Sequence, residues 1–579
     1  MKEKETQSAF TIVWPQGSVV EVGSSVDFVY IMRKDGVFAM SPIAQKMASE
    51  YHVDEEQLTS VLLEEYDTFF AKLADTFHVG YASKGNFELH LYDPETLDTA
   101  VKSKAGSTSI ISLDPLMKKG VQQFGVSRGY FLGGTKDFGQ VARPGNDTLF
   151  NQAKAISSTL HGHPVVVSED DIFSGGSVIA SLNALLASGV TIEKVIPGIQ
   201  IGEPKKLEDM GIGVDPVIKY KTTDEVDIFS KLDLGDPRDY LLGASGLVIQ
   251  LPDGELGRAP YILPFVSPAA RAGIPEGIEK EFSMHVLQAN LEFFKKIQEK
   301  TGAPILLKHM DSQFQVYMYD MYGVDVHTTM SQIAMWLMDN MDTLWEMTQK
   351  QGEFQEKLAS LHLPKKMIFL DVNGTLFSDE SVDGYIALGD IAMLKEKMAK
   401  VKENGFIIGL CSDSPFPQLA YLAETLGIDG PILAENGNIL WFEGKSVVLH
   451  ALPEIDAYKE QVMLVADMHG FQKIDDCIAP EFGGTAPMTQ SGQWSFGAGR
   501  ETSVTVFAPA ELIKKLGVSF GGDQTSYSID CSPEYGFFAL HPGENYKKNK
   551  GKALDLLVAY GHAIVMVGNS MSDWVDPEH

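Results

Sequence analysis

The sequence of 579 residues contains little cysteine and comparatively few basic residues. Its three cysteines, Cys411, Cys477 and Cys531, lie far apart and form neither a metal-binding spacing nor a disulfide framework, which fits a reducing cytoplasm. Lys and Arg number 47 against 78 Asp and Glu, for a formal net charge of −31. Because so acidic a surface repels phosphate backbones, we expect no nucleic-acid partner.

Long hydrophobic runs are also absent. No run reaches the about 18 apolar residues that indicate a membrane span, so we expect no membrane partner. The first residues, MKEKETQSAF, lack the apolar segment of a signal peptide. A hydrophobic fraction of 44% and a mean hydropathy of −0.05 are typical of a globular protein. The composition therefore predicts a cytoplasmic protein of several domains.

The spacing of apolar residues predicts an α/β fold. Between residues 108 and 200, strand-like runs alternate with helical ones, which favours a largely parallel sheet. Long helical patterns rich in Met and Leu follow, and the α/β alternation then returns. We predict an α/β domain with an N-terminal extension over residues 1–240, a mainly helical connecting region over 241–360, and a second α/β domain over 361–579.

The segment MIFLDVNGTL, residues 367–376, carries the clearest chemical signal. Its apolar run delivers Asp371 to the end of a strand, where a carboxylate is well placed to attack phosphorus. A second apolar strand ends at Ser412, whose hydroxyl is suited to hold a phosphate oxygen. Downstream, Lys550 lies in a basic loop that enters a helix, and GNSMSD follows a last apolar strand.

These segments occur in an order that resembles the haloacid dehalogenase superfamily of phosphohydrolases. The resemblance implies a Rossmann-like core in which Asp371 is the nucleophile that forms a phospho-aspartate. It further implies that Ser412 holds the phosphoryl group and that Lys550 neutralises charge in the transition state. Asn569 and Asp573 match the two acidic positions of the family's Gly-Asp-x-x-Asn-Asp motif.

The same resemblance implies a cofactor and a further domain. Mg²⁺ prefers a few carboxylate or carbonyl oxygens, and the implied ligands are Asp371, Asn373, Asn569 and Asp573. The sequence Ala-Glu-Asn-Gly at residues 434–437 is similar to a hallmark of the Cof-like subfamily. In that subfamily an α/β cap lies between the second and third motifs, here at about residues 415–545.

Two residues depart from the family pattern. Asn373 occupies the position of the acid/base that protonates the leaving group, and Asn569 replaces a metal-binding aspartate. An amide does not act as a general acid, and general acid–base catalysis contributes about 10²–10⁴-fold. Two hypotheses therefore stay open: an active phosphatase, or a catalytically attenuated nucleotide- or phosphosugar-binding regulatory protein.

The N-terminal region contains a second signal, VVVSEDDIFSGGS at residues 165–177. An apolar strand ends in Glu169 and Asp170, which are suited to bind vicinal ribose hydroxyls. The residues Ser174, Gly175, Gly176 and Ser177 then open a helix, where backbone N–H groups converge on a phosphate. The alternative is a loop in which the two glycines are accidental.

This arrangement resembles the ribose-phosphate motif of type I phosphoribosyltransferases, particularly the orotate type. The resemblance implies phosphoribosyl pyrophosphate or a nucleotide as ligand. Transfer also needs a pyrophosphate loop, for which Arg128, Lys136 and Arg143 are candidates without a clear match. Together, the two resemblances predict a Mg²⁺-dependent phosphohydrolase of a small phosphorylated metabolite, of sugar phosphate or nucleotide type. It is fused to a domain that either transfers or only binds a phosphoribosyl group.

Overall fold

The computed structural model describes residues 10–173, 175–223, 227–373, 375–376, 388–478, 492–521 and 526–568. It divides into two compact units, Met1–Gln355 and Glu356–His579, which are considered separately below. Both are mixed α/β structures with parallel sheets, as predicted. Within the described part of the chain, no helix combines the length and the apolar character needed to cross a bilayer.

Unit 1 contains three sheets. A four-stranded parallel sheet has the order β1-β4-β3-β13, and a seven-stranded sheet has the order β2-β12-β10-β9-β5-β6 with β11 beside β10. A small mixed sheet has the order β15-β14-β7-β8. The strands of the first sheet are β1 (Phe10–Val13), β4 (Phe87–Tyr92), β3 (Phe28–Arg33) and β13 (Leu232–Leu234). Those of the second are β2 (Val19–Val22), β12 (Ile218–Thr222), β10 (Ile192–Gln200), β9 (Val165–Ile172), β5 (Ser109–Ser112), β6 (Gln122–Gln123) and β11 (Gly213–Val214), and those of the third are β15 (Leu256–Ala259), β14 (Leu247–Gln250), β7 (Val126–Tyr130) and β8 (Asp137–Ala142).

The seven-stranded sheet positions the predicted phosphate loop. The strand β9 lies between β5 and β10 and is parallel to both. Its first residues, Val165–Val167, are fully buried, as β-branched residues are in a parallel sheet covered on both faces. Val165 and Val167 pack in one hydrophobic cluster with residues of α4 (Leu149–Leu160) and α5 (Gly176–Ala187).

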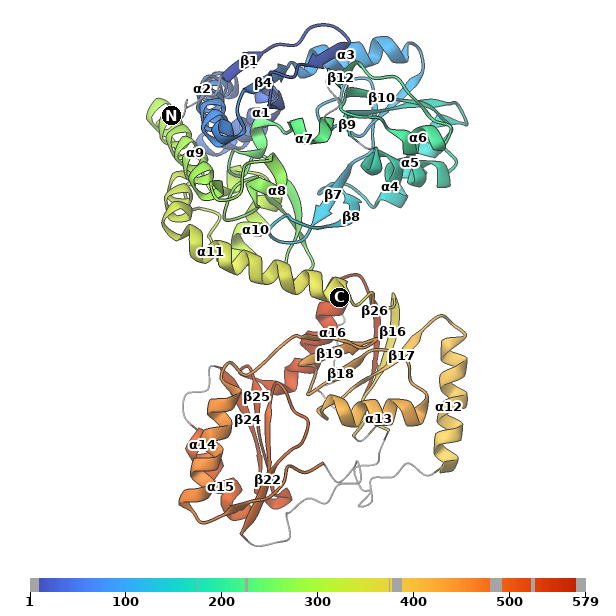
Figure 1. Cartoon of the computed structure of the whole chain (residues 1–579), viewed down its shortest axis with the longest axis vertical. Helices are drawn as coiled ribbons and strands as arrows, with labels where there is room; N and C mark the ends of the chain where they lie inside the picture. The colour runs from blue at the N-terminus through green and yellow to red at the C-terminus, as the bar shows by residue number, and fades with distance from the viewer. Residues whose placement is uncertain are drawn as a thin grey trace, which may run out of the picture. The chain divides into compact units, whose positions relative to one another are not determined.

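The helices of unit 1 join the two regions that the sequence suggested were separate. One hydrophobic cluster contains Tyr30 of β3, Phe77 of α2, Phe282 of α9 and Leu337 of α11. The helix α2 packs against α9, beside which it lies in Figure 1. The boundary predicted near residue 240 therefore falls inside a continuous core. The helices are α1 (Gly36–Tyr51), α2 (Glu55–Tyr81), α3 (Pro94–Ala105), α6 (Lys205–Asp209), α7 (Ile228–Lys231), α8 (Pro268–Ala272), α9 (Glu279–Thr301), α10 (Ser312–Tyr322) and α11 (Met330–Ala359).

The central sheet of unit 2 has the order β20-β19-β18-β17-β16-β26. Its strands β26, β16, β17 and β18 are parallel, and β18 and β19 form an antiparallel hairpin around Asn436 and Gly437. The elements are β16 (Lys366–Leu370), α12 (Leu388–Lys402), β17 (Ile407–Cys411), α13 (Phe416–Leu426), β18 (Ile432–Ala434), β19 (Ile439–Phe442), β20 (Lys445–Val448), α16 (Asn549–Ala559) and β26 (Ala563–Val567).

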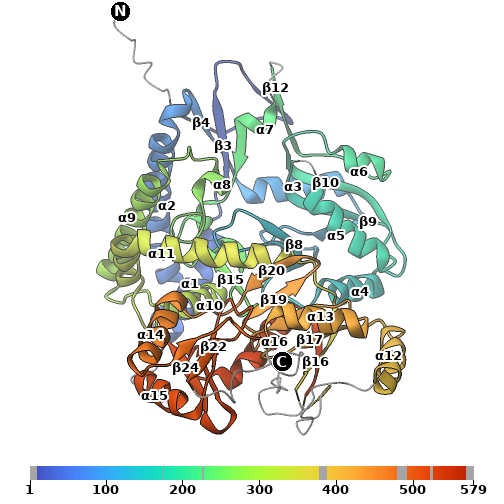
Figure 2. The ribbon, with the colours of Figure 1, turned by 60° about the horizontal axis from the view of Figure 1, so that its bottom comes forward.

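A separate five-stranded sheet in unit 2 has the order β21-β22-β23-β25-β24. Two helices, α14 and α15, lie side by side on one face of it (Figure 1 and Figure 2). This sheet falls inside the interval predicted for a cap, about 415–545. The first part of that interval instead supplies α13, which packs against the central sheet, and the strands β18, β19 and β20 of that sheet. The elements are α14 (Ile455–Met468), β21 (Gln472–Lys473), β22 (Gln493–Phe496), β23 (Val504–Phe507), α15 (Ala510–Phe520), β24 (Tyr527–Ser532) and β25 (Phe537–Pro542).

The hairpin between β18 and β19 touches the start of α16 through Gly437. This residue has φ +83°, and a Cβ atom there would lie 3.0 Å from the Cα of Lys550 and 3.1 Å from the carbonyl oxygen of Asn549. Only glycine combines that backbone conformation with so close an approach. The hairpin therefore sets the position of the first turn of α16.

We predict that Gly437→Ala destabilises unit 2 more than Gly427→Ala does. Gly427 also has positive φ, but a Cβ atom there would meet no atom within 4 Å, so alanine costs only the backbone strain of about 1–2 kcal/mol. At Gly437 the displacement of α16 adds at least about 1 kcal/mol, as overpacking does. Urea unfolding of both variants measures the difference, and equal losses would show that the close approach is not a constraint.

Candidate functional site

The carboxyl edge of the central sheet gathers the predicted catalytic side chains. The strand β16 lies between β17 and β26, and Asp371 follows it directly; the backbone N–H of Asp371 donates to the carbonyl of Val567 at 2.9 Å. Ser412 follows the neighbouring strand β17 and is buried, and its N–H donates to the carbonyl of Leu433 at 3.0 Å. The ends of adjacent parallel strands thus place these two residues on one edge.

Lys550 completes this group from the first turn of α16. Its Nζ lies 2.7 Å from Oδ1 of Asp371, and the two side chains are 7% and 5% exposed. A charge so deeply buried is stable only beside a partner of opposite sign. The pair therefore places a carboxylate beside an ammonium group. A carboxylate can attack phosphorus, and an ammonium group can stabilise the negative charge on the phosphoryl oxygens.

The structure describes some, but not all, of the remaining predicted site residues of unit 2. The Oγ of Ser412 accepts a hydrogen bond from the N–H of Ser414 at 3.3 Å, and both serines are buried. Asn373 is exposed. Asn569 and Asp573 lie outside the described residues.

The oxygen donors at Asp371 and Asn373 are of the kind that Mg²⁺ prefers, a carboxylate and an amide or backbone carbonyl. They fit a magnesium ion in chemical type. A different acidic group, Asp253, Glu255 and Asp320, lies in unit 1, with its carboxylate oxygens within 4.8 Å of one another. All three residues are exposed, and no prediction from the sequence concerned them.

Glu435 links the two sheets of unit 2. It is fully buried with φ 50°, and its carboxylate accepts hydrogen bonds from the backbone N–H groups of Glu501, Thr502 and Ser503 at 2.6–3.0 Å. The hydroxyls of Thr502 and Ser503 donate to it as well, at 2.8 and 2.6 Å. These five donors satisfy the buried charge, and they fix the loop between β22 and β23.

Arg500, in the same loop, reaches the sheet edge that carries Asp371 and Ser412. Arg500 approaches Asp413 through both terminal nitrogens, at 3.3 and 3.2 Å, and also donates to Oγ of Ser503 at 3.1 Å. Burial by itself would raise the pKa of Asp413, but Arg500, His541 and Lys550 lower that pKa to about 2. Asp413 is therefore ionised at neutral pH.

Sequence reasoning missed this ion pair. The available signal was Asp413 itself, an acidic residue directly after Ser412 at a strand end. Its partner is 87 positions away, in a loop whose place in the fold the sequence does not reveal.

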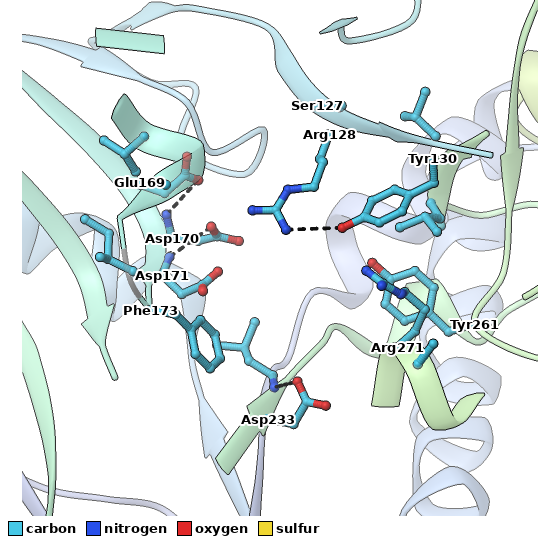
Figure 3. Close-up of a pocket in the computed structure, with 18 of the residues that line it drawn as sticks. Ser127, Arg128, Tyr130, Glu169, Asp170, Asp171, Phe173, Asp233, Tyr261 and Arg271 are labelled. Carbon is cyan, nitrogen blue, oxygen red and sulfur yellow. Dashed lines mark hydrogen bonds between the residues drawn. The ribbon is translucent and has the colours of Figure 1, made fainter. Parts of the chain in front are cut away.

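A cavity of about 450 Å³ in unit 1 is lined by the other predicted motif. Glu169 and Asp170, from the end of β9, contribute to its wall together with Asp171, and Gly175 and Gly176 contribute the adjoining loop. Figure 3 shows the three acidic side chains on one side of this cavity. The structure therefore brings the predicted acids and glycines to a single site.

The glycines open the helix α5. Gly175 is its N-cap residue, with φ +80°, a conformation that favours glycine. The first N–H groups of a helix have no partner within it and attract anions. Ser174 lies outside the described residues, and the side chain of Ser177 is not described.

Asp170 is held by a buried arginine. Arg33, which is 1% exposed, lies 2.7 Å from Asp114, 2.7 Å from Asp170 and 2.8 Å from Asp236. Burial opposes ionisation of Asp170, but Arg33 outweighs it and lowers the pKa of Asp170. This ion pair was not predicted, because Arg33 lies in a strand far from the motif.

Glu169 and Asp171, the neighbours of Asp170 in the sequence, have raised rather than lowered pKa values. Burial, and then the charge of Asp170, raise the pKa of Glu169 and of Asp171 well above their usual ranges. Both side chains are nevertheless partly exposed to the cavity. A ligand that donates hydroxyl hydrogens to these carboxylates would favour their ionised forms.

The opposite wall of the cavity carries basic and aromatic side chains (Figure 3). Arg128 donates to the hydroxyl of Tyr130 at 3.3 Å, and the guanidinium of Arg271 lies 4.3 Å from the centre of the Tyr130 ring. Tyr261 lines the same wall. Arg143, another residue considered from the sequence, lines an adjoining cavity of about 350 Å³.

Comparison with known proteins gives partial matches. No family model matches the chain. A curated phosphoglycolate phosphatase from Sulfolobus acidocaldarius is 36% identical over 81 residues, which are 14% of this chain and 33% of that protein. The chain thus matches about a third of the length of this curated relative.

Partial matches among solved structures include two haloacid dehalogenase-like hydrolases. The one from Bacteroides thetaiotaomicron is 18% identical and has a TM-score of 0.26, with 36% of this chain and 83% of that chain covered. The one from B. subtilis is 15% identical with a TM-score of 0.26, covering 36% and 84%.

We predict that Arg33→Met destabilises unit 1 by about 3–5 kcal/mol, because it leaves carboxylates buried without their cation. Lys104→Met is the matched control, since the side chains of the Lys104–Asp215 pair are 34% and 40% exposed and a surface pair contributes about 0–1 kcal/mol. Urea unfolding gives the free energies. A loss for Arg33→Met no larger than for the control would mean that the acids take up protons at little cost.

Proposed function

We propose that the chain is a phosphohydrolase of small phosphorylated metabolites, of sugar phosphate or nucleotide type, that acts through Asp371. The observation that carries this proposal is the buried Asp371–Lys550 pair at the carboxyl edge of the central sheet, with Ser412 at the end of the next strand. The 36% identity of 81 residues to a phosphoglycolate phosphatase supports the same reaction class.

The proposed reaction has two steps. A carboxylate oxygen of Asp371 attacks phosphorus, the bond from phosphorus to the leaving oxygen breaks, and that oxygen takes a proton from solvent water. Water then attacks the aspartyl phosphate, which releases phosphate and restores the carboxylate. Lys550 compensates the charge on the phosphoryl oxygens, and the Ser412 hydroxyl donates a hydrogen bond to one of them.

Magnesium is part of this proposal. The ion would supply additional positive charge to the phosphoryl oxygens, with Asp371 and Asn373 among its ligands and Asn569 and Asp573 as the other predicted ones. Because Asn373 is an amide, the chain offers no general acid at that position, which would slow the departure of poor leaving groups. The alternative, an attenuated binding protein, rests on the same substitution.

We predict that Asp371→Asn lowers kcat for phosphate release by at least about 10³-fold, the scale seen when a nucleophile is removed. A fixed-time phosphate assay with sugar phosphates and nucleotides measures this, with and without Mg²⁺. The variant should also lose any rise in unfolding temperature that Mg²⁺ gives the wild type, a readout independent of turnover. Asp429→Asn, at a surface pair of the same unit, is the matched control and should retain full activity.

Two results would contradict the proposal. An Asp371→Asn rate within threefold of wild type would remove Asp371 from the mechanism. A wild-type protein that binds phosphorylated ligands but turns over none of them would favour the attenuated binding protein.

For unit 1 we propose that the cavity beside Gly175 and Gly176 binds a ribose phosphate, such as phosphoribosyl pyrophosphate or a nucleotide. The helix N-terminus of α5 suits the phosphate, and Glu169 with Asp171 suits the ribose hydroxyls. Asp170 would support them indirectly through its bond to Arg33. Binding of this ligand does not by itself require transfer of the phosphoribosyl group.

We predict that phosphoribosyl pyrophosphate or ribose 5-phosphate stabilises unit 1 by about 2.7 kcal/mol at a hundred times its Kd. Glu169→Gln should weaken binding about tenfold, because one charged acceptor is lost. Glu208→Gln, at an exposed position in α6, should bind like wild type. Calorimetric titration tests all three proteins, and the absence of binding at millimolar ligand would mark the loop as structural.

A further inference from the structure

We propose that Asp413 and Arg500 form the subsite for the leaving group of the substrate and select neutral, hydroxyl-rich leaving groups over carboxylate-bearing ones. This inference rests on the proposed phosphohydrolase function of unit 2. It assigns a specificity role to two residues in different parts of that unit, one beside the catalytic serine and one in the loop between β22 and β23.

The position of the pair supports this role. Asp413 is bonded in sequence to Ser412, at the edge where Asp371 and Lys550 meet. Lys550 is close enough to contribute to the low pKa of Asp413. A phosphorylated molecule whose phosphoryl group lies between Asp371 and Ser412 would therefore extend its other end past Asp413.

Residues other than Asp413 hold Arg500 in place. Glu435 holds the next three residues, 501–503, through five hydrogen bonds, and Ser503 accepts a further bond from Arg500. The Arg500 side chain is 9% exposed, whereas that of Asp413 is 39% exposed. The pair thus faces solvent on its Asp413 side, where a leaving group would arrive.

The chemistry of the pair favours hydroxyl groups. Asp413 offers acceptors and Arg500 offers donors, and their charges cancel, so a diol can bond to both without bringing charge of its own. A carboxylate would have to displace Asp413 from Arg500 and would be repelled by it. The two N–O distances, 3.2 and 3.3 Å, exceed the about 2.7–2.9 Å of a tight charged pair, so the pair is held less tightly than a close bidentate one.

Glycerol 3-phosphate and 3-phosphoglycerate provide a matched test, since they differ in one terminal group, a hydroxymethyl against a carboxylate. We expect wild type to have the higher kcat/KM for glycerol 3-phosphate. Asp413→Asn should raise the 3-phosphoglycerate to glycerol 3-phosphate ratio at least tenfold, because Arg500 is then available to the carboxylate. Arg500→Gln should lower kcat/KM for glycerol 3-phosphate about tenfold, mainly through KM.

A third variant and a control separate a shared subsite from a general defect. In the double variant Asp413→Asn/Arg500→Gln, the effects on glycerol 3-phosphate should be less than additive, as for two residues that act as one unit. Asp429→Asn should leave the substrate ratio unchanged. An unaltered ratio in Asp413→Asn, with both substrates turned over, would overturn the subsite.

p-Nitrophenyl phosphate, which has no hydroxyl or carboxylate beyond the phosphoryl group, separates the two proposals. Turnover of this reporter by wild type, with no preference between the glycerol derivatives, would overturn the subsite and leave the phosphohydrolase standing. No turnover of these three compounds, or of the sugar phosphates and nucleotides in the phosphate assay, would overturn the phosphohydrolase and the subsite together.

Discussion

A carboxylate buried at the end of a strand needs a positive charge or several hydrogen-bond donors beside it, because water no longer solvates it. Both units meet this requirement at the places where their motifs lie. Lys550 compensates Asp371, Arg500 compensates Asp413, and Arg33 compensates Asp170. These pairings join α16, the loop after β22 and β3 to the strand ends that carry the carboxylates.

Apolar runs ending in a polar residue were sufficient to predict where Asp371, Ser412 and Glu169 lie. Such a pattern is local, since it needs only a strand and the turn after it. The partners of these residues could not be predicted in the same way. Arg33 meets Asp236 across 203 positions, and Arg500 meets Asp413 across 87, so only the folded chain brings them together.

The packing of the helices after residue 240 could not be predicted from the local sequence either. The long Met-rich helices differ in composition from the α/β region before them, which suggested a separate connecting region. In the structure, Phe282 and Leu337 of these helices share one cluster with Tyr30 of β3. Amphipathic spacing predicts that a helix has a buried face, but not which surface covers that face.

The hairpin at residues 434–437 connects more of unit 2 than its length suggests. Glu435 holds the loop of the five-stranded sheet, the side chain of Asn436 donates to the carbonyl of Tyr546, and Gly437 touches α16. One turn thereby contacts both the element that carries Lys550 and the loop that carries Arg500. The relative placement of two side chains from distant segments is thus set by one short piece of chain.

Arg33 of β3 couples the two large sheets of unit 1 during local unfolding. Asp236 follows β13 of the four-stranded sheet, whereas Asp114 and Asp170 belong to the ends of β5 and β9 in the seven-stranded sheet. Separating these sheets would break the ion pairs of Arg33 and would leave unpaired charges on both sheets at once. We therefore infer that the two sheets exchange their amide hydrogens as one cooperative unit rather than in independent openings.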